Sequence, residues 1–271
     1  MFDPPPSAAL SRLGEGDVDA DAVNAHRWLR ADPAWIRPDI NGARLYGVGS
    51  MLPIDTDDVA AFLPDLQTLL DDAGCRLEAV TPHRWYLRMP PDAVVPRFST
   101  LAQALGADPF DHPPEGEGSR GWRTLDSEVQ IALHQHPRNT ERRRTGRPPV
   151  NALWWWGDAV LPDAAADAVP TIHSDDPLFR GIARRANVHC GPLPACWPVD
   201  ADGFYDLRGQ RGDALIEGWL LPALGAVERG MHMQWIGEEG EGFALSPQQR
   251  WRFWRKPLIP ASSPDTWMAG A

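Results

Sequence analysis

Residues 122–157 read WRTLDSEVQIALHQHPRNTERRRTGRPPVNALWWWG and hold most of the chemically specific residues of the chain. The stretch predicts a helix that begins near Thr124 or Asp126 and ends close to Pro137, because proline removes a backbone donor and clashes with the preceding turn. A cluster of arginines and a Pro-Pro turn follow. Residues 151–156 then indicate a buried strand, since a short apolar run after turn residues is typical of one.

Composition excludes two classes of function. The chain has 271 residues, a hydrophobic fraction of 43%, a formal net charge of −11 and a pI near 5.1. Such a chain can bury a core. It lacks the overall basic charge that neutralises nucleic-acid phosphates or docks on anionic membranes. We therefore expect neither nucleic acid nor membrane as a partner.

Cysteine usage and the first residues indicate the compartment. The three cysteines, Cys75, Cys190 and Cys196, show no disulfide framework, which favours a reducing environment. The N-terminus has neither the basic start nor the apolar run of a signal peptide, and no segment is apolar for long enough to cross a bilayer. We predict a cytoplasmic protein with three reduced thiols.

Hydrophobic periodicity predicts an α/β fold in which a sheet is flanked by helices. Acidic residues at 55–57 offer N-caps for the first long helix. Helices are expected over residues 22–29, 59–73, 101–105, 177–185 and 214–227, besides the central one. Strands are expected over residues 44–48, 76–80, 84–89, 151–156, 171–173, 231–236 and 249–255. We expect a flexible segment over residues 1–34, a single domain over residues 35–258 and a tail over residues 259–271.

Five arginines fall within ten residues of this acidic chain, at positions 138, 142, 143, 144 and 147. Guanidinium groups bind phosphate or carboxylate through two parallel hydrogen bonds. One interpretation is therefore an anion site. The other is a solvated basic turn that pairs with the carboxylates of the protein itself, and the residues alone leave both open.

The histidines of the central stretch do not predict a metal site. His134 and His136 would point to different faces of a helix and could not share one ion there. We expect His136 to pack and hydrogen-bond at the helix end. Asn151 must satisfy its amide if it is buried, either by fixing the preceding loop or by facing a ligand. Trp154, Trp155 and Trp156 cannot all face one side of a strand.

The central stretch resembles the RpfE-type regulatory proteins of proteobacteria, which are described as relatives of archaeal-type, cofactor-independent phosphoglycerate mutases. The residues that carry the resemblance are Glu128, Gln130, Leu133, His134, His136, Pro137, Asn139, Arg142, Gly146, Pro148, Pro149, Val150, Asn151, Leu153, Trp154, Trp156 and Gly157. Further matches are Arg84 to Tyr86, Asp176 to Leu178, Arg180-Gly181 and Arg250 to Arg255. Ser127, Asp158 and Ala159 depart from the pattern.

The resemblance implies part of an alkaline-phosphatase-superfamily fold that binds substrate without transferring phosphate. Such mutases hold two divalent metals through separated Asp and His motifs and use a serine acceptor. We find none of these motifs, so we predict no catalytic residues, no metal ligands and no cofactor. The residues expected to contact a ligand are Glu128, His136, Asn139, Arg142, Asn151 and Trp156.

Three functions follow as hypotheses. The leading one is a non-catalytic regulatory protein of the RpfE-like group that binds a small phosphate- or carboxylate-bearing metabolite or a protein partner. Alternatives are a mutase-type phosphotransferase with divergent metal sites and an interaction module without a small ligand. Under the leading hypothesis Asn139, Arg142 and Asn151 form an anion site, and removing the Arg142 side chain leaves the fold intact.

Overall fold

The computed structural model describes residues 7–40, 42–163, 170–198, 202–237 and 242–248. The chain divides into two compact units, of which one comprises Met1–Leu193 with Asp202–Tyr205 and the other Pro194–Ala201 with Asp206–Ala271. Both units contain helices and strands, which confirms the mixed α and β class. The single domain expected over residues 35–258 stays a prediction; the second unit begins at Pro194 but leaves Asp202–Tyr205 in the first.

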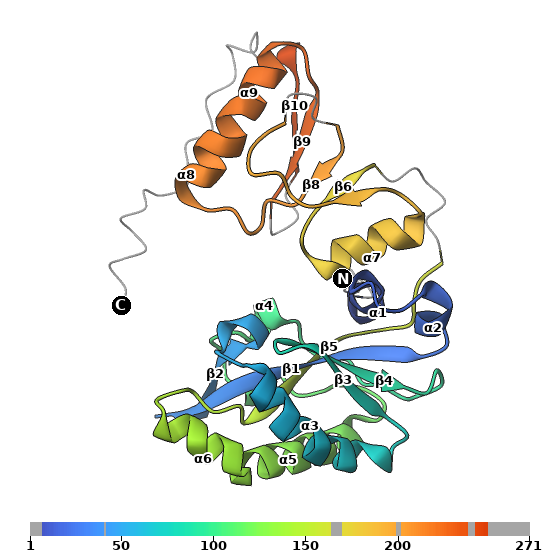
Figure 1. Cartoon of the computed structure of the whole chain (residues 1–271), viewed down its shortest axis with the longest axis vertical. Helices are drawn as coiled ribbons and strands as arrows, with labels where there is room; N and C mark the ends of the chain where they lie inside the picture. Colours follow the sequence, from blue (N-terminus) through green and yellow to red (C-terminus); the bar gives the residue numbers. More distant parts are fainter. Residues whose placement is uncertain (1–6, 41, 164–169, 199–201, 238–241, 249–271) are drawn as a thin grey trace. The chain divides into compact units, whose positions relative to one another are not determined.

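Within the described part of the first unit, five strands form an antiparallel sheet (Figure 1). They are β1 (Arg27–Asp39), β2 (Gly42–Val48), β3 (Arg76–Thr81), β4 (Arg84–Met89) and β5 (Ala152–Ala159). The long β1 is the central strand. One edge of β1 pairs with β5, and the other pairs first with β4 and then, from Ala34 onward, with β2.

Strand β1 was not predicted, because two X-Pro pairs read as helix breaks and residues 22–29 read as a helix. Only Ala20–Asn24 form a short helix, α2. The amide of Asn151 donates to Ala34 O, so Pro33 presents its backbone to the opposite edge. On that edge the β4 ladder ends at Arg30 and the β2 ladder begins at Ala34. Pro33 therefore lies in the gap between two partners, where its missing N–H is not needed.

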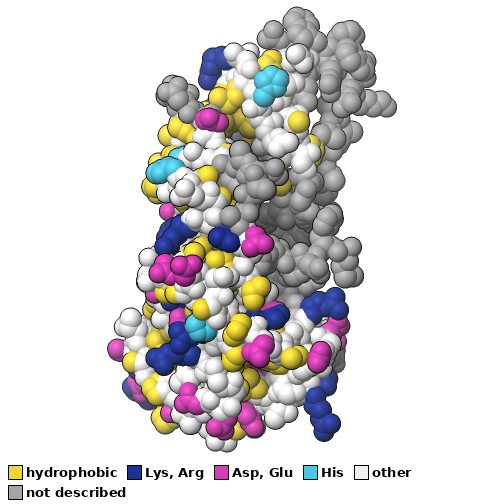
Figure 2. Space-filling model, turned by 90° about the vertical axis from the view of Figure 1, so that its right-hand side faces the viewer, with side chains coloured by type: hydrophobic (Ala, Val, Ile, Leu, Met, Phe, Trp, Pro, Cys, Tyr) yellow, Lys and Arg dark blue, Asp and Glu magenta, His cyan; other side chains and the backbone are white. Residues whose placement is uncertain are grey.

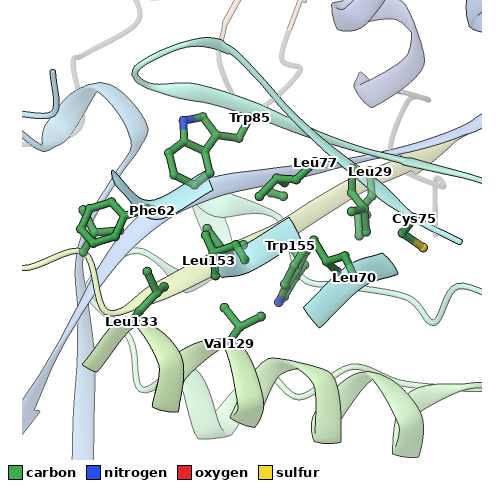
Figure 3. Close-up of a cluster of buried hydrophobic side chains, with 14 of the residues drawn as sticks. Leu29, Phe62, Leu70, Cys75, Leu77, Trp85, Val129, Leu133, Leu153 and Trp155 are labelled. Atoms are coloured by element: carbon green, nitrogen blue, oxygen red, sulfur yellow. The ribbon is translucent and has the colours of Figure 1, made fainter. Parts of the chain in front are cut away.

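One face of the sheet is covered by α3 (Thr56–Asp71), α5 (Ser119–Gln135) and α6 (Pro137–Arg144). Apolar side chains of α3 and α5 recur at helical spacing and meet those of the strands. Figure 3 shows Val129 and Leu133 of α5 directed at Leu153 and Trp155 of β5. Trp155 faces this core and Trp154 belongs to a cluster on the other face, so these tryptophans divide between the two sides as predicted.

Helix α5 begins earlier than expected, at Ser119 after Gly118, whose φ of 77° is left-handed. No side chain caps this start, so the usual signal was absent from the sequence. Asp126, which we expected near the start, lies inside the helix. Its Oδ1 accepts from Trp155 Nε1 at 2.8 Å. Burial raises the pKa of Asp126, although the hydrogen bonds from Trp155 and Gln130 act in the opposite direction.

The other face of the sheet carries α1 (Ser7–Gly14), which also contacts α7 (Pro177–Ala186). All eight residues of α1 are buried, so this part of the segment expected to be flexible is a packed helix. A Cβ at Gly181 would lie 1.7 Å from Leu10 O, and one at Gly14 would lie 1.8 Å from Pro177 O. The two helices therefore meet backbone to backbone, which only glycine permits.

Smaller elements complete the first unit. The expected short helix is α4 (Leu101–Ala104), and single 3₁₀ turns lie at Gly49–Met51 and Pro109–Asp111. A second sheet consists of β6 (Ile172–His173), β7 (Cys190–Gly191) and β8 (Phe204–Tyr205), all parallel. Helix α7 begins at Pro177 after the N-cap Asp176, as the sequence predicts.

The second unit holds α8 (Gly212–Leu215), a π-helical turn (Ile216–Leu220), α9 (Leu221–Glu228) and the hairpin of β9 (Met233–Ile236) and β10 (Gly242–Leu245). As expected, the helix is perturbed near Pro222. Proline has no N–H, so it cannot donate the helical hydrogen bond to Gly218 O, and the preceding turn is π-helical. The amide of Trp197 donates to that carbonyl instead, at 2.8 Å. Strand β10 was not expected, and the predicted strand 249–255 and tail 259–271 lie outside the described residues.

Surface and thiol features bear on the predicted partners. In the part of the chain that the structure describes, no helix is long and apolar enough to span a bilayer. Basic and acidic side chains are interspersed on the face shown in Figure 2. All three cysteines are free: Cys75 is buried, Cys190 is partly buried and Cys196 is exposed. Burial raises the pKa of the Cys75 thiol.

Candidate functional site

The start of α3 is the centre of a charged cluster on the helical face. Asp55 and Asp58 form a reciprocal capping box, with Asp58 N to Asp55 Oδ1 at 2.8 Å and Asp55 N to Asp58 Oδ2 at 3.1 Å. The fully buried Asp58 carboxylate also accepts from Arg138 Nε at 2.7 Å, from Arg147 Nη2 at 2.6 Å and from Arg142. Three arginines of the central stretch thus converge on one internal carboxylate.

Arg142 lies at the centre of this cluster and is 1% exposed. Its Nε and Nη2 donate to Pro148 O at 2.9 and 2.8 Å, and its Nη1 donates to Pro53 O at 3.1 Å and to Asp58. Burial lowers the pKa of Arg142 despite the attraction of Asp58. The guanidinium therefore ties two loops to α3. It is not presented to solvent in the way that an anion site requires.

The two asparagines expected beside Arg142 also bond to the backbone. Asn139, which is fully buried, donates to Leu133 O at 2.7 Å and Val150 O at 2.6 Å, and accepts from Val150 N at 2.9 Å. Asn151 accepts from Ile36 N at 2.8 Å and donates to Ile36 O at 2.7 Å. Asn139 bonds both backbone polar groups of Val150, and Asn151 bonds both of those of Ile36, so the two side chains fix the segment before β5.

The other three expected ligand residues lie apart. His136 caps α6 by accepting from Arg138 N at 3.1 Å, and its ring packs against Phe62, as expected for a structural histidine. Glu128 is exposed on α5. Trp156 projects from the opposite face of the sheet, where its Nε1 donates to Asp32 Oδ2 at 2.9 Å. The six residues do not line one cavity, and their role in binding stays a prediction.

One signal in the sequence could have revealed the Asp58 cluster. The Asp-x-x-Asp spacing of residues 55 and 58 is that of a capping box, whose second acidic side chain lies in the first helical turn. Starting the helix at Val59 left Asp58 outside it. The pairing with arginines some 80 residues later carries no local signal, because it depends on how α3 and α6 pack.

A second charged network lies beneath α1 on the other face of the sheet. Arg30 and Asp32, neighbours on one face of β1, form a forked ion pair with both Nη2 distances at 2.8 Å. The Arg30 guanidinium lies between the rings of Tyr86 and Trp156, at 5.0 and 4.9 Å from their centroids. Tyr86 is fully buried, and burial raises the pKa of its hydroxyl. Sequence reasoning missed this network because Asp32 read only as a helix-breaking Asp-Pro.

A depression of about 230 Å³ lies at the start of α7, and we call it the Arg180 depression. Its lining residues are Ser174, Asp175, Arg180, Cys190, Gly191 and Pro192. Arg180 donates to Asp175 O at 2.8 Å and lies 3.9 Å from the Asp175 carboxylate, with its side chain 43% exposed. Arg180 can therefore offer further donors to a ligand. Burial raises the pKa of the Cys190 thiol although the charge of Arg180 opposes it, which favours the neutral thiol.

Comparison with known proteins gives a distant relationship. No family model matches the chain. Among curated proteins, a probable 2,3-bisphosphoglycerate-independent phosphoglycerate mutase of Geobacter sulfurreducens is 27% identical over 158 residues, which cover 55% of this chain and 36% of that protein. The chain thus spans about a third of the length of the curated relative it matches.

Within the described residues, no three His, Cys, Asp or Glu side chains are grouped as metal ligands.

Two solved structures match part of this chain, each with a TM-score of 0.41. A cofactor-independent phosphoglycerate mutase from Thermoplasma acidophilum is 18% identical, with 74% of this chain and 55% of that chain covered. A protein of Pyrococcus horikoshii is 15% identical, with 70% of this chain and 43% of that chain covered. The sequence match establishes a distant relationship to the cofactor-independent phosphoglycerate mutases over part of the chain.

Proposed function

We propose that this chain is a non-catalytic regulatory protein of the RpfE-like group that binds a small phosphate- or carboxylate-bearing metabolite in the Arg180 depression. The observation that carries the proposal is the contrast among the arginines. Arg142 is buried in internal hydrogen bonds, whereas Arg180 lines a hollow and, among the described residues, makes one hydrogen bond to a backbone carbonyl. An exposed guanidinium with unused donors is the group that recognises an oxyanion.

The size and charge of the depression narrow the ligand. Its volume of about 230 Å³ lies below the roughly 300–1,000 Å³ of sites for drug-sized ligands. This favours a metabolite of a few carbon atoms. The carboxylate of Asp175 lies 3.9 Å from Arg180 and repels an anion. We therefore expect modest affinity, which removal of the Asp175 charge would raise.

The test is a ligand titration followed by thermal unfolding. Inorganic phosphate and 3-phosphoglycerate should stabilise the protein, since a ligand that binds only the native state raises its melting temperature. Arg180→Ala should weaken binding roughly tenfold to hundredfold, the effect of losing about 1.5–3 kcal/mol from a charged hydrogen bond. Asp175→Asn should strengthen it. Arg143→Ala, which removes an exposed arginine of α6, is the matched control and should leave binding unchanged.

Equal stabilisation of wild type and Arg180→Ala would refute the depression as the site. The distant relationship to mutases favours a second candidate, phosphoryl transfer with divergent metal sites. Interconversion of 3-phosphoglycerate and 2-phosphoglycerate is assayed with Mn²⁺ or Mg²⁺ for this purpose. Turnover above a protein-free control that is lost on chelation would establish the mutase and exclude the non-catalytic role.

A further inference from the structure

The carboxylate of Glu15, just after α1, occupies a set of donors supplied by strand β4. Arg84 donates two parallel hydrogen bonds to this carboxylate, from Nε to Oε1 at 2.7 Å and from Nη2 to Oε2 at 3.0 Å. The Tyr86 hydroxyl donates to Oε1 at 2.8 Å and lies 2.6 Å from Ser11 Oγ. A guanidinium fork with a neutral hydroxyl is the donor pattern of a carboxylate-binding site.

The charges around Glu15 balance only when a carboxylate is present. Arg30 is already matched by Asp32, while the partner of Arg84 is Glu15. Burial alone would raise the pKa of Glu15, but the hydrogen bonds from Arg84 and Tyr86 and the charges of Arg84 and Arg30 bring it below its ordinary value. Without Glu15 the donors would keep one uncompensated positive charge. An anion bound there would restore the balance.

The donors and the carboxylate differ in how they are held. Tyr86 pairs with Arg30 of β1 and with Glu78 of β3, and Arg84 pairs with Thr81 of β3, so strand pairing positions the backbone of both residues without Glu15. The Glu15 side chain is 5% exposed, whereas that of Arg84 is 35% exposed and gives solvent a route to the fork. Rotation of the Glu15 side chain would free the fork while α1 stays packed against α7.

We propose that Arg84 and Tyr86 form a carboxylate-binding site that the chain fills with its own Glu15, so that a carboxylate-bearing metabolite competes with this side chain. The tethered carboxylate acts at a high effective concentration and sets a threshold for the external ligand. This site is independent of the Arg180 depression. The fork, the hydroxyl and a carboxylate already seated on them are the observations that support it.

The probe is glutarate, each end of which has the same carboxylate on a short methylene chain as the Glu15 side chain. Binding is measured by calorimetry. All variants carry Arg180→Ala, so that the depression cannot contribute and failure of the proposed function does not affect the result. With Glu15 present, binding should be weak, in the millimolar range. Glu15→Ala should bind glutarate at least tenfold more tightly, because the internal competitor is gone. Adding Arg84→Ala to either protein should abolish binding.

A matched control separates a built site from any vacated arginine. Arg27 holds Asp158 with the same fork, Nε to Oδ1 at 2.7 Å and Nη2 to Oδ2 at 2.5 Å, and among the described residues Asp158 has no tyrosine partner. Asp158→Ala should therefore gain no glutarate affinity. An equal gain in Asp158→Ala and Glu15→Ala would overturn the proposal. So would the absence of Arg84-dependent binding when Glu15 is present, even if Glu15→Ala binds.

Discussion

The two faces of the central sheet treat their charges in different ways. On the helical face, Asp58 and Arg142 are almost fully buried, and four of the five N–H groups of Arg142 bond to the protein. On the α1 face, about a third of the Arg84 side chain is exposed to solvent. Arg142 therefore has few donors left for an anion, although it lies in the arginine cluster of the central stretch. Available donors, and not the number of charges, decide what a site can recognise.

The largest expected effect tests the structural role of the helical face. Arg142→Ala leaves Asp58 buried beside Arg138 and Arg147 but empties the inner position, and removing one partner of a buried ion pair typically costs about 3–5 kcal/mol. We expect this loss in the free energy of unfolding, measured with urea. Arg144→Ala, whose side chain is 72% exposed and pairs with Glu141, should change it by less than about 0.5 kcal/mol.

This prediction reverses the expectation from sequence that Arg142 is dispensable for the fold. If Arg142→Ala unfolds at the urea concentration of wild type, the buried pair contributes little. The anion-site hypothesis for Asn139, Arg142 and Asn151 would then regain its main support. Asp58→Ala alone should cost at least as much as Arg142→Ala, because it leaves the buried Arg142 without its carboxylate and also removes the α3 capping box.

The next largest effect concerns the attachment of α1. Gly181→Ala places a methyl group 1.7 Å from Leu10 O, so α1 and α7 must separate. Overpacking of this kind costs about 1–3 kcal/mol, and more where backbone must move. Gly121→Ala in α5 meets nothing within 4 Å and should stabilise the protein by up to about 1 kcal/mol. Melting temperatures of the two variants check this, and equal values would contradict the close helix crossing.

The smallest expected effects concern how stability changes with pH. Glu15 on the α1 face and Asp126 on the helical face should change it in opposite directions. The folded-state pKa of Glu15 is lowered, so its contribution is present above the unfolded pKa and disappears as the pH falls through the folded pKa. The folded-state pKa of Asp126 is raised, so its ionised form destabilises the fold, and this penalty disappears as the pH falls through the folded pKa to the unfolded one.

Urea unfolding of Glu15→Gln and Asp126→Asn between pH 3 and pH 7 measures both signs. At pH 7 the free energy of unfolding of wild type should exceed that of Glu15→Gln by about 1 kcal/mol. This difference should shrink as the pH falls. The free energy of unfolding of Asp126→Asn should equal or exceed that of wild type at pH 7, since an amide oxygen still accepts the hydrogen bond from Trp155. A difference between wild type and either variant that stays constant with pH would rule out the corresponding pKa shift.

The sequence by itself determined those elements whose signals are local. The periodicity of α3, the Asp176-Pro177 start of α7 and the strand expected over residues 84–89 place these elements within a few residues of their observed bounds. The assignment of His136 to the helix end was equally local, because it rests on Pro137. The division of Trp154 and Trp155 between two faces followed from the geometry of any strand.

Tertiary structure alone decided where charges and prolines are tolerated. Pro33 lies within a central strand because β4 and β2 leave a gap opposite it, and nothing in the neighbouring sequence encodes that gap. Arg142 and Glu15 gained their partners from segments about 70 to 84 residues away. A side chain's chemistry can be read from its identity, whereas the number of donors left for a ligand depends on partners that only folding brings within hydrogen-bond distance.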